Sequence, residues 1–243
     1  MTEVRQISPS RLLLFGGTGS IGAAISRCFQ EDGWEVVIVS RQNSHETSHV
    51  SWDPSSGQAS SDAAAMEILE KKGPFDAVCW AQGMNCTDSV YDFDIEKHEA
   101  VYRANVIYIL NSLQRLLAHK VLRKPARLCV ISSIWQDIAR QKKLSYCVTK
   151  AALHGLVLSA AADLASEGHV INAVMPGVID TPMTRANLGP EQVRKVEDAT
   201  LFARLPTLEE VATCVYGLCA SRKTAVTGQF IAVDLGFSSV RIL

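Results

Sequence analysis

The sequence lacks the features that mark secreted, disulfide-stapled or membrane-spanning proteins. Its seven cysteines include no C-x-x-C pair, and an odd number without a regular spacing is typical of free thiols in a reducing compartment. The first 11 residues contain no long apolar stretch such as a signal peptide needs. The chain also has no run of about 18 apolar residues, the length that predicts a transmembrane helix. We therefore expect a soluble, cytoplasmic protein with no membrane partner.

An excess of charge of one sign is also missing. The 24 basic and 25 acidic residues give a formal net charge of −1 at pH 7. Nucleic-acid-binding proteins usually carry an excess of Lys and Arg, so this balance predicts no nucleic-acid partner. No linker rich in Pro, Gly and Ser divides the 243 residues, and this length suits one large α/β domain. We expect a polar tail at residues 1–10 and a single domain at 11–243.

A glycine-rich turn lies between two apolar runs near the N-terminus. Residues 11–15 predict a buried strand, residues 23–32 a helix, and residues 34–40 a second, β-branched strand. Glycines allow a backbone to approach a pyrophosphate closely, and the N-terminus of the following helix supplies N–H groups. A turn without a ligand could have the same composition, but the order of strand, glycine turn, helix and strand favours a dinucleotide site. The residues expected to contact the cofactor there are Gly16, Thr18, Gly19, Ser20, Ile21 and Gly22.

The residues after the second strand predict which dinucleotide binds. An acidic residue at this point would bond the ribose 2′-OH of NAD, whereas this sequence has Ser40 and Arg41. A cation suits the 2′-phosphate of NADP, so we expect NADP(H) to be favoured over NAD(H), although a solvated arginine at a strand end is common. A short strand at 49–52 then leads to Asp53, which is either an adenine contact or a turn former.

Strands and helices alternate along the rest of the chain. We expect strands at 75–80, 127–133, 169–175 and 229–233, and helices at 61–72, 94–119, 146–166 and 207–220. Such alternation predicts a parallel sheet covered by helices on both faces. Two helices, around 98–119 and 146–166, are apolar nearly all round, whereas packing on a sheet needs only one apolar stripe. Their additional apolar faces predict a homodimer or homotetramer.

Residues 133–150 contain the pattern with the clearest chemistry. Tyr146 and Lys150 are four residues apart, so a helix would bring a phenol and an ammonium group to one face. A neighbouring cation lowers the pKa of a phenol from about 10, which would make Tyr146 a general acid or base. Ser133, at the end of an apolar run, is expected to hydrogen-bond the same substrate oxygen. Tyr and Lys are common at helix starts, so the pattern alone also fits a structural role.

Taken together, the motifs resemble those of the shorter oxidoreductase branch of the short-chain dehydrogenase/reductase family, over nearly the whole chain. The family's T-G-x-x-x-G-x-G corresponds to residues 15–22, with Phe15 in place of the threonine and Ser20 in place of the middle glycine. The same residues can be read as the G-x-x-G-x-x-G of the extended branch, but 243 residues leave little room for its additional domain. The family's N-N-A-G corresponds to residues 80–83, WAQG, and its C-terminal D-G-G to residues 234–236, DLG.

The resemblance implies a Rossmann-like, doubly wound parallel sheet of about seven strands with helices on both faces. It also implies a mobile lid at about 182–206 and a catalytic tetrad of Asn105, Ser133, Tyr146 and Lys150. In that tetrad Lys150 would bind the nicotinamide ribose, and Asn105 would hold a water that links Lys150 to solvent. The other cofactor contacts that the resemblance implies are Ala81, Gln82, Gly83, Tyr146, Lys150, Pro176, Gly177, Ile179 and Thr181.

The activity that the resemblance implies is an NAD(P)(H)-dependent interconversion of a ketone and a secondary alcohol by hydride transfer. The expected partner is a small-molecule carbonyl or alcohol substrate, and no metal is expected. A narrower alternative is a 3-oxoacyl-thioester reductase of the acyl-carrier-protein type, to which residues 204–212, RLPTLEEVA, are similar. An alternative of a different class is a sensor that binds NADP without turnover, although such a protein would not need Tyr146.

Overall fold

The computed structural model describes residues 9–42, 47–181, 184–185, 188–221 and 223–240, and within them seven parallel strands form one sheet. Most of the predicted polar tail and four residues of the predicted lid (182, 183, 186 and 187) lie outside this part of the chain. The strand order is β3-β2-β1-β4-β5-β6-β7. The strands are β1 (Arg11–Phe15), β2 (Glu35–Ser40), β3 (His49–Ser51), β4 (Phe75–Trp80), β5 (Leu122–Ile131), β6 (Val170–Pro176) and β7 (Phe230–Val233).

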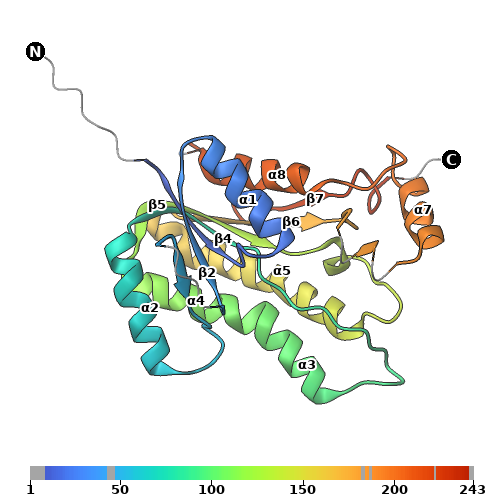
Figure 1. Ribbon diagram of the computed structural model, residues 1–243, viewed down its shortest axis with the longest axis horizontal. Coiled ribbons are helices and arrows are strands. Elements are labelled where there is room, and N and C mark those ends of the chain that lie inside the picture. The colour runs from blue at the N-terminus through green and yellow to red at the C-terminus, as the bar shows by residue number, and fades with distance from the viewer. Residues whose placement is uncertain (1–8, 43–46, 182–183, 186–187, 222, 241–243) are drawn as a thin grey trace, which may run out of the picture.

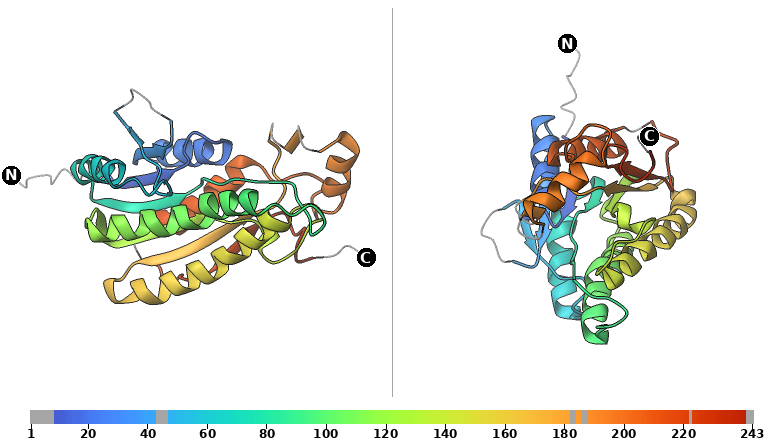
Figure 2. Two further views of the ribbon diagram at one scale, coloured as in Figure 1. Left: turned by 90° about the horizontal axis from the view of Figure 1, so that it is seen from below. Right: turned by 90° about the vertical axis from the view of Figure 1, so that its right-hand side faces the viewer.

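Helices cover both faces of this sheet, which confirms the predicted Rossmann-like, doubly wound fold (Figure 1). Helices α1 and α8 lie together on one face, whereas α2, α4 and α5 lie on the other, with α4 and α5 side by side (Figures 1 and 2). The longer helices are α1 (Ser20–Glu31), α2 (Ala59–Lys72), α3 (Ile95–Tyr102), α4 (Tyr108–Ala118), α5 (Leu144–Leu164), α7 (Pro190–Asp198) and α8 (Leu208–Ala220).

Strand β1 shows why a continuous apolar run is needed at the centre of such a sheet. Its side chains alternate between the two faces: Leu13 and Phe15 enter the core under α2, α4 and α5, whereas Leu12 and Leu14 enter the core under α1 and α8. All four are fully buried. A parallel strand covered by helices on both faces therefore reads as an unbroken apolar segment and not as an alternating one.

The structure differs from the sequence prediction in the long helix expected at 94–119. The helix is interrupted by a π-helical turn at Arg103–Ile107, which separates α3 from α4 and contains Asn105. Strand β5 begins at Leu122, five residues before the predicted start, and α7 occupies part of the segment expected to be a lid. Single π-turns in helices are frequent at functional sites, so the interruption at Asn105 directs attention to that residue.

By length and composition, one helix in the described part of the chain meets the criteria for a membrane span. This is Leu144–Glu167, whose most apolar window has a mean hydropathy of 1.3. It includes Lys150, so it is not the continuous apolar run that the sequence analysis looked for. The core helix of a soluble protein meets the same criteria, and this helix buries Leu153 and Val157 completely against the sheet.

Candidate active site

A cleft of about 310 Å³ opens at the carboxyl ends of β1, β2 and β4. The strand order reverses between β1 and β4, and ligands of open α/β sheets bind in the crevice at such a point. The residues that line the cleft are Gly16, Thr18, Gly19, Ser40, Arg41, Gln42, Asp53, Ser55, Ala81, Gln82, Gly83, Met84, Ala104 and Tyr108. Nine of these fourteen were expected as cofactor contacts from the sequence.

The glycine-rich turn packs too closely on its neighbours for larger residues. Gly16 has φ +75°, and a Cβ there would lie 2.6 Å from the backbone nitrogen of Gln82. A Cβ on Gly22 would lie 2.2 Å from the Gly16 carbonyl oxygen, so α1 can begin this close to β1 only with glycine at that position. Gly19 caps α1 without any side-chain acceptor, and the first turn contains no acidic residue. The start of α1 therefore suits an anionic group such as a pyrophosphate.

The amide of Gln82 tests whether the cleft fits a polar ligand. Its oxygen and nitrogen are both buried, and neither has a hydrogen-bond partner among the described residues. A buried polar group without a partner costs about 1–3 kcal/mol, so such groups are normally paired. Gln82 lines the cleft, and the hydroxyl-rich and amine-rich parts of a dinucleotide would supply the missing partners. The residues present therefore fit a nicotinamide dinucleotide.

The outer end of the cleft carries opposite charges. Arg41 and Asp53 both line it, and Asp53 Oδ1 accepts hydrogen bonds from the Ser55 backbone N–H at 2.9 Å and from its hydroxyl at 2.6 Å. Asp53 is therefore a turn former as well as a cleft residue. Tyr108 faces the same space, and its pKa is raised by burial and by the charge of Asp53.

Sequence reasoning missed five residues of the cleft. Tyr108 could have been found, because it lies three residues after Asn105 in a segment expected to be helical, so both belong to one face. The others are loop residues or small side chains with no pattern of their own, namely Gln42, Ser55, Met84 and Ala104.

Tyr146, Ser133 and Lys150 come together beside the cleft. Tyr146 is in the first turn of α5, Lys150 is one turn later, and Ser133 follows β5. The Ser133 hydroxyl hydrogen-bonds the Tyr146 phenol and lowers its pKa, but burial has the larger effect and raises that pKa to about 12. The Lys150 ammonium donates to the Ile131 carbonyl oxygen at 2.9 Å, and burial lowers its pKa to about 8.

These values correct the expectation that Lys150 lowers the phenol pKa. The ammonium lies 5.7 Å from the centre of the Tyr146 ring and is bonded to a backbone carbonyl, so it is not paired with the phenol oxygen. Burial disfavours the charged form of both groups, which raises the pKa of a phenol and lowers that of an amine. Tyr146 therefore keeps its proton at neutral pH.

Asn105 is buried between the segment after β4 and helix α5. Its Oδ1 accepts from the Met84 backbone N–H at 2.7 Å, and its Nδ2 donates to the Met84 carbonyl and to Thr149 Oγ1, each at 2.9 Å. A Cβ added at Gly83 would lie 3.4 Å from Asn105 Oδ1 and 3.9 Å from Lys150 Nζ. Gly83 therefore marks the point where Asn105 and Lys150 approach each other.

The remaining predicted contacts lie outside the lining of this cleft. Ser20, Ile21 and Gly22 form the first turn of α1, and Gly177 follows β6, where its N–H donates to the Val233 carbonyl at 2.9 Å. Pro176 ends β6, Ile179 is buried in the core under α1 and α8, and Thr181 Oγ1 hydrogen-bonds Thr184 Oγ1 at 3.1 Å.

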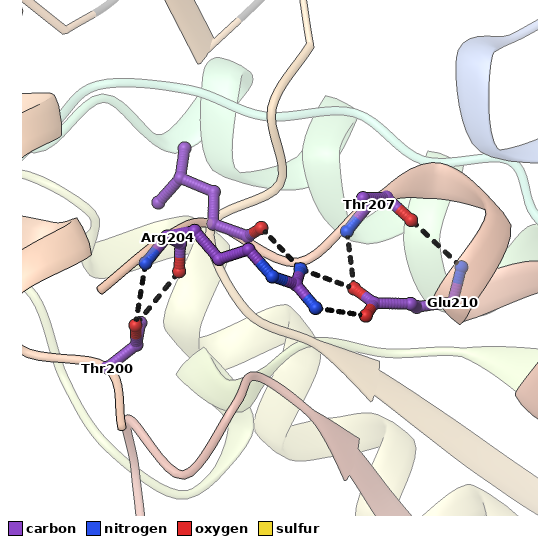
Figure 3. Close-up of polar contacts among 5 residues, drawn as sticks. Thr200, Arg204, Thr207 and Glu210 are labelled. Carbon is purple, nitrogen blue, oxygen red and sulfur yellow. Dashed lines mark hydrogen bonds and ion pairs between the residues drawn. The ribbon is translucent and has the colours of Figure 1, made fainter. Parts of the chain in front are cut away.

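The segment that follows α7 is fixed to the start of α8 by a polar network (Figure 3). Arg204 forms two hydrogen bonds with the Glu210 carboxylate, at 2.6 and 3.0 Å, and the pair holds the pKa of Glu210 at about 2. Thr207 caps α8 by accepting from the Glu210 N–H, and Thr200 bonds the backbone of Arg204. The C-terminal end of the predicted lid is therefore held in place by charge and capping.

Comparisons with known proteins show the family to which the chain belongs. A family model described as enoyl-(acyl carrier protein) reductase matches residues 16–238. The chain belongs to the short-chain dehydrogenase/reductase family of oxidoreductases. It is 24% identical over 239 residues to the uncharacterized oxidoreductase YmfI of Bacillus subtilis, covering 93% of this chain and 97% of that one. It is 25% identical over 240 residues to the 3-oxoacyl-[acyl-carrier-protein] reductase FabG of Aggregatibacter actinomycetemcomitans, covering 93% and 98%.

Solved structures of the family share the fold. A gluconate 5-dehydrogenase from Burkholderia cenocepacia, in complex with NADP and tartrate, superposes with a TM-score of 0.87 at 23% identity, covering 96% of this chain and 97% of that one. A short-chain dehydrogenase family protein from Francisella tularensis superposes with a TM-score of 0.84 at 24% identity, covering 96% and 100%. The seven-stranded parallel sheet is therefore that of the short-chain dehydrogenase/reductase family.

Two residues that depart from the family's motifs pack against each other. Phe15 replaces the threonine of the glycine motif, and Trp80 replaces the first asparagine of N-N-A-G on the neighbouring strand. Their rings stack with centroids 5.7 Å apart and an interplanar angle of 6°, and the Trp80 indole donates to Ser112 Oγ at 2.8 Å. Ring stacking and burial thus hold these two side chains in the core under α2, α4 and α5, and neither lines the cleft.

Proposed function

We propose that this short-chain dehydrogenase/reductase is an NADP-preferring enzyme that interconverts a ketone and a secondary alcohol, with Tyr146 as its general acid and base. The observation that supports this most is the convergence of Ser133, Tyr146 and Lys150 beside a cleft suited to a dinucleotide. A protein that only bound NADP would gain nothing from a buried phenol paired with a serine hydroxyl. This argues against the alternative that the protein is a sensor that binds NADP without turnover.

The bound nicotinamide would supply or accept the hydride at the substrate carbon. In reduction, negative charge develops on the carbonyl oxygen, and Tyr146 donates its proton to that oxygen. The Ser133 hydroxyl donates a hydrogen bond to the same oxygen and stabilises its charge. With a pKa of about 12, Tyr146 remains protonated at neutral pH, which favours its work as a proton donor.

Lys150 and Asn105 would act on either side of Tyr146. One of the three protons of the Lys150 ammonium is donated to the Ile131 carbonyl, which leaves the others for the ribose hydroxyls of the cofactor. Asn105 would fix the backbone at Met84 and, as in the family's tetrad, hold a water that carries protons between Lys150 and solvent.

The preference for NADP rests on Arg41. This residue lines the cleft just after β2, at the position where an acidic residue would bond a free ribose 2′-hydroxyl. A guanidinium at this place suits a 2′-phosphate, which it can bind through two parallel hydrogen bonds. The related gluconate 5-dehydrogenase was solved with NADP bound, which is in line with this preference.

The substrate class has a narrower second candidate, a 3-oxoacyl thioester bound to an acyl carrier. It is favoured by the names of relatives, among them a 3-oxoacyl-[acyl-carrier-protein] reductase that matches over 93% of this chain. Turnover of acetoacetyl thioesters with NADPH, compared with turnover of simple ketones, separates the two. A kcat/KM for the thioesters well above the kcat/KM for simple ketones would support the carrier-linked substrate.

The test of the proposed function is a fluorescence titration with NADPH and NADH, followed by assays on ketones and acyl thioesters. We expect tighter binding of NADPH than of NADH and carbonyl reduction that requires Tyr146. Binding without turnover on the whole panel would support the sensor instead. Failure to bind either cofactor would overturn the proposal.

We further propose that the protein is a cytoplasmic homo-oligomer assembled through α4 and α5. A groove of about 510 Å³ runs between these helices, with an apolar lining that includes Leu110, Leu113, Leu117 and Leu156. Leu110 is 45% exposed, and a Cβ on Gly155 would meet no atom within 4 Å, so this face is open to close approach by another helix pair. Leu110→Glu should convert a dimer or tetramer to monomer in light scattering, and an unchanged mass would exclude this face as the interface.

A further inference from the structure

The first turn of α5 is held by a carboxylate from another part of the chain. Asp88 lies after β4, and its Oδ1 and Oδ2 accept from the Ser145 backbone N–H at 3.1 and 3.3 Å. The Ser145 hydroxyl also donates to Asp88 Oδ2. Asp88 is 3% exposed and Ser145 is fully buried, so solvent does not compete for these bonds. Asp88 therefore caps the helix that carries Tyr146, from 57 residues away in the sequence.

The same segment satisfies the neighbouring donors of that turn. The first N–H groups of a helix have no partner within it. Here the Leu144 N–H donates to the Asp88 carbonyl oxygen at 3.3 Å, and the Tyr146 N–H donates to the sulfur of Cys86. Three consecutive N–H groups at the start of α5, including that of Tyr146, thus bond to residues 86–88.

His98 completes the arrangement from helix α3. Its Nδ1 lies 2.8 Å from Ser145 Oγ. Because the single hydroxyl proton of Ser145 is donated to Asp88, Ser145 must accept at this contact, and His98 Nδ1 must carry the hydrogen. The chain of bonds therefore runs from His98 through Ser145 to Asp88, and its middle member, Ser145, directly precedes Tyr146.

One end of residues 84–88 bonds to Asn105, and the other end bonds to the helical turn that contains Tyr146. At one end, Asn105 bonds both backbone groups of Met84 and the hydroxyl of Thr149, which in turn donates to the Tyr146 carbonyl at 2.9 Å. At the other end, Asp88 caps the turn that contains Tyr146. This segment thus connects the π-turn of Asn105 to the start of α5 through hydrogen bonds at both of its ends.

We propose that Asp88 is a positioning residue for Tyr146, acting through Ser145. The inference rests on the proposed function, since it concerns the same phenol. Proton transfer requires the phenol oxygen at hydrogen-bond distance from the substrate oxygen, and a displacement of about 1 Å can cost about 10²-fold in rate. Without the carboxylate, the first turn of α5 loses its cap and the Tyr146 oxygen loses its fixed place.

The test compares Asp88→Ala with Asp88→Asn in steady-state kinetics, with active sites counted by NADPH-binding stoichiometry. We expect Asp88→Ala to lose about 10- to 100-fold in kcat per site, with the KM for the carbonyl and the Kd for NADPH nearly unchanged. Asparagine is as good a helix cap as aspartate, so Asp88→Asn should retain kcat within about threefold. Ser145→Ala removes the hydroxyl contacts with Asp88 and His98 but keeps the backbone N–H bonds to Asp88, so it should give a smaller loss than Asp88→Ala.

Asp62→Ala is the matched control. Asp62, on α2, is also a buried carboxylate, and it accepts hydrogen bonds from Trp52, which follows β3, and from Arg115 on α4, so these contacts do not involve α5. Its loss should lower thermal stability and leave kcat per site unchanged. A role of Asp88 in stability alone would reduce the number of binding sites or the Tm but not kcat per site, and that result would overturn the inference. If Asp88→Ala does not fold, an unchanged kcat in Ser145→Ala would overturn it instead.

The outcomes also separate this inference from the proposed function. A wild-type protein that reduces no carbonyl, or that keeps full turnover as Tyr146→Phe, contradicts the proposed function itself. Turnover that depends on Tyr146 but is unaffected in Asp88→Ala contradicts only the positioning role.

Discussion

The ammonium group of Lys150 lies 5.7 Å from the centre of the Tyr146 ring, while its hydrogen bond goes to the carbonyl of Ile131. Burial disfavours the charged form of each group. It therefore raises the pKa of the phenol to about 12 and lowers the pKa of the amine to about 8. At pH 7 the phenol therefore keeps its proton, and most of the lysine is still charged. In the proposed mechanism these protonation states suit the donation of a proton by Tyr146 to the carbonyl oxygen during reduction.

Tyr146→Phe should abolish most turnover and leave cofactor binding intact. The change removes one hydroxyl, and general acid catalysis by such a group contributes about 10²- to 10⁴-fold in rate. We expect a loss of that size in kcat, with a Kd for NADPH close to that of the wild type in a fluorescence titration. Tyr91→Phe is the control, because Tyr91 is 97% exposed and should show wild-type kinetics. Wild-type turnover in Tyr146→Phe would remove the phenol from the mechanism.

Binding of NADPH should weaken as pH rises through about 8. The proposed contact of Lys150 with the ribose uses the ammonium form, and burial lowers its pKa to about 8. A base is protonated below its pKa, so the contact is complete at pH 7 and is lost as Lys150 deprotonates above pH 8. We expect a Kd that is constant between pH 7 and 7.5 and then increases, by at most about tenfold per pH unit.

Two variants identify the group responsible for that pH dependence. An arginine keeps its charge at every pH in this range, so Lys150→Arg should remove the increase in Kd between pH 8 and 9.5. Lys150→Met should bind weakly at all pH values. If Lys150→Met retained the wild-type pH profile, the titrating group would have to be a different one.

The fold and most of the cleft could be predicted because they depend on local patterns. Strand β1 is buried on both faces and so appears as an unbroken apolar run, and Gly16 and Gly22 occupy positions where no Cβ fits. Tyr146 and Lys150 are one helical turn apart, so their common face follows from spacing alone.

The features that the sequence did not predict depend on long-range contacts. Asp88 has no motif, and its role as a cap appears only when β4 and α5 are folded next to each other. The π-turn at Asn105 interrupts a sequence with an unbroken helical pattern, because the Asn105 amide bonds Met84 and Thr149. The pKa of Tyr146 was predicted in the wrong direction, since spacing shows the neighbouring cation but not the depth of burial.

Arg41→Ala should weaken NADPH binding selectively. A charge-assisted hydrogen bond contributes about 1.5–3 kcal/mol, which corresponds to about 10- to 100-fold in Kd for NADPH. NADH has no 2′-phosphate, so its Kd should change little. Arg27→Ala is the control, since Arg27 is exposed on α1 and its ion pair with Glu209 is long, at 3.6 Å. Equal loss for both cofactors would contradict a 2′-phosphate contact.

Gln82→Met should stabilise the protein and weaken the binding of both NADPH and NADH. Met has a similar length but no polar atoms, so the change removes two buried groups that have no partner in the described part of the chain. Such groups cost about 1–3 kcal/mol, and a gain of about 1 kcal/mol raises the Tm of a chain of this size by about 2–4 °C. The lost hydrogen bonds to bound cofactor should raise the Kd for NADPH and NADH alike, by about 5- to 10-fold.

Gln136→Met is the control for stability, and we expect it to change the Tm in the opposite direction from Gln82→Met. The Gln136 amide is also buried, but it is satisfied: its oxygen accepts from Ser132 at 2.8 Å and its nitrogen donates to Asp137 at 3.2 Å. Removing it leaves the Ser132 hydroxyl without a partner, so the Tm should fall, whereas it should rise in Gln82→Met. A fall in the Tm of both variants would mean that a group other than the cofactor pairs the Gln82 amide in solution. The unpaired amide would then no longer be evidence that the cleft binds a polar ligand.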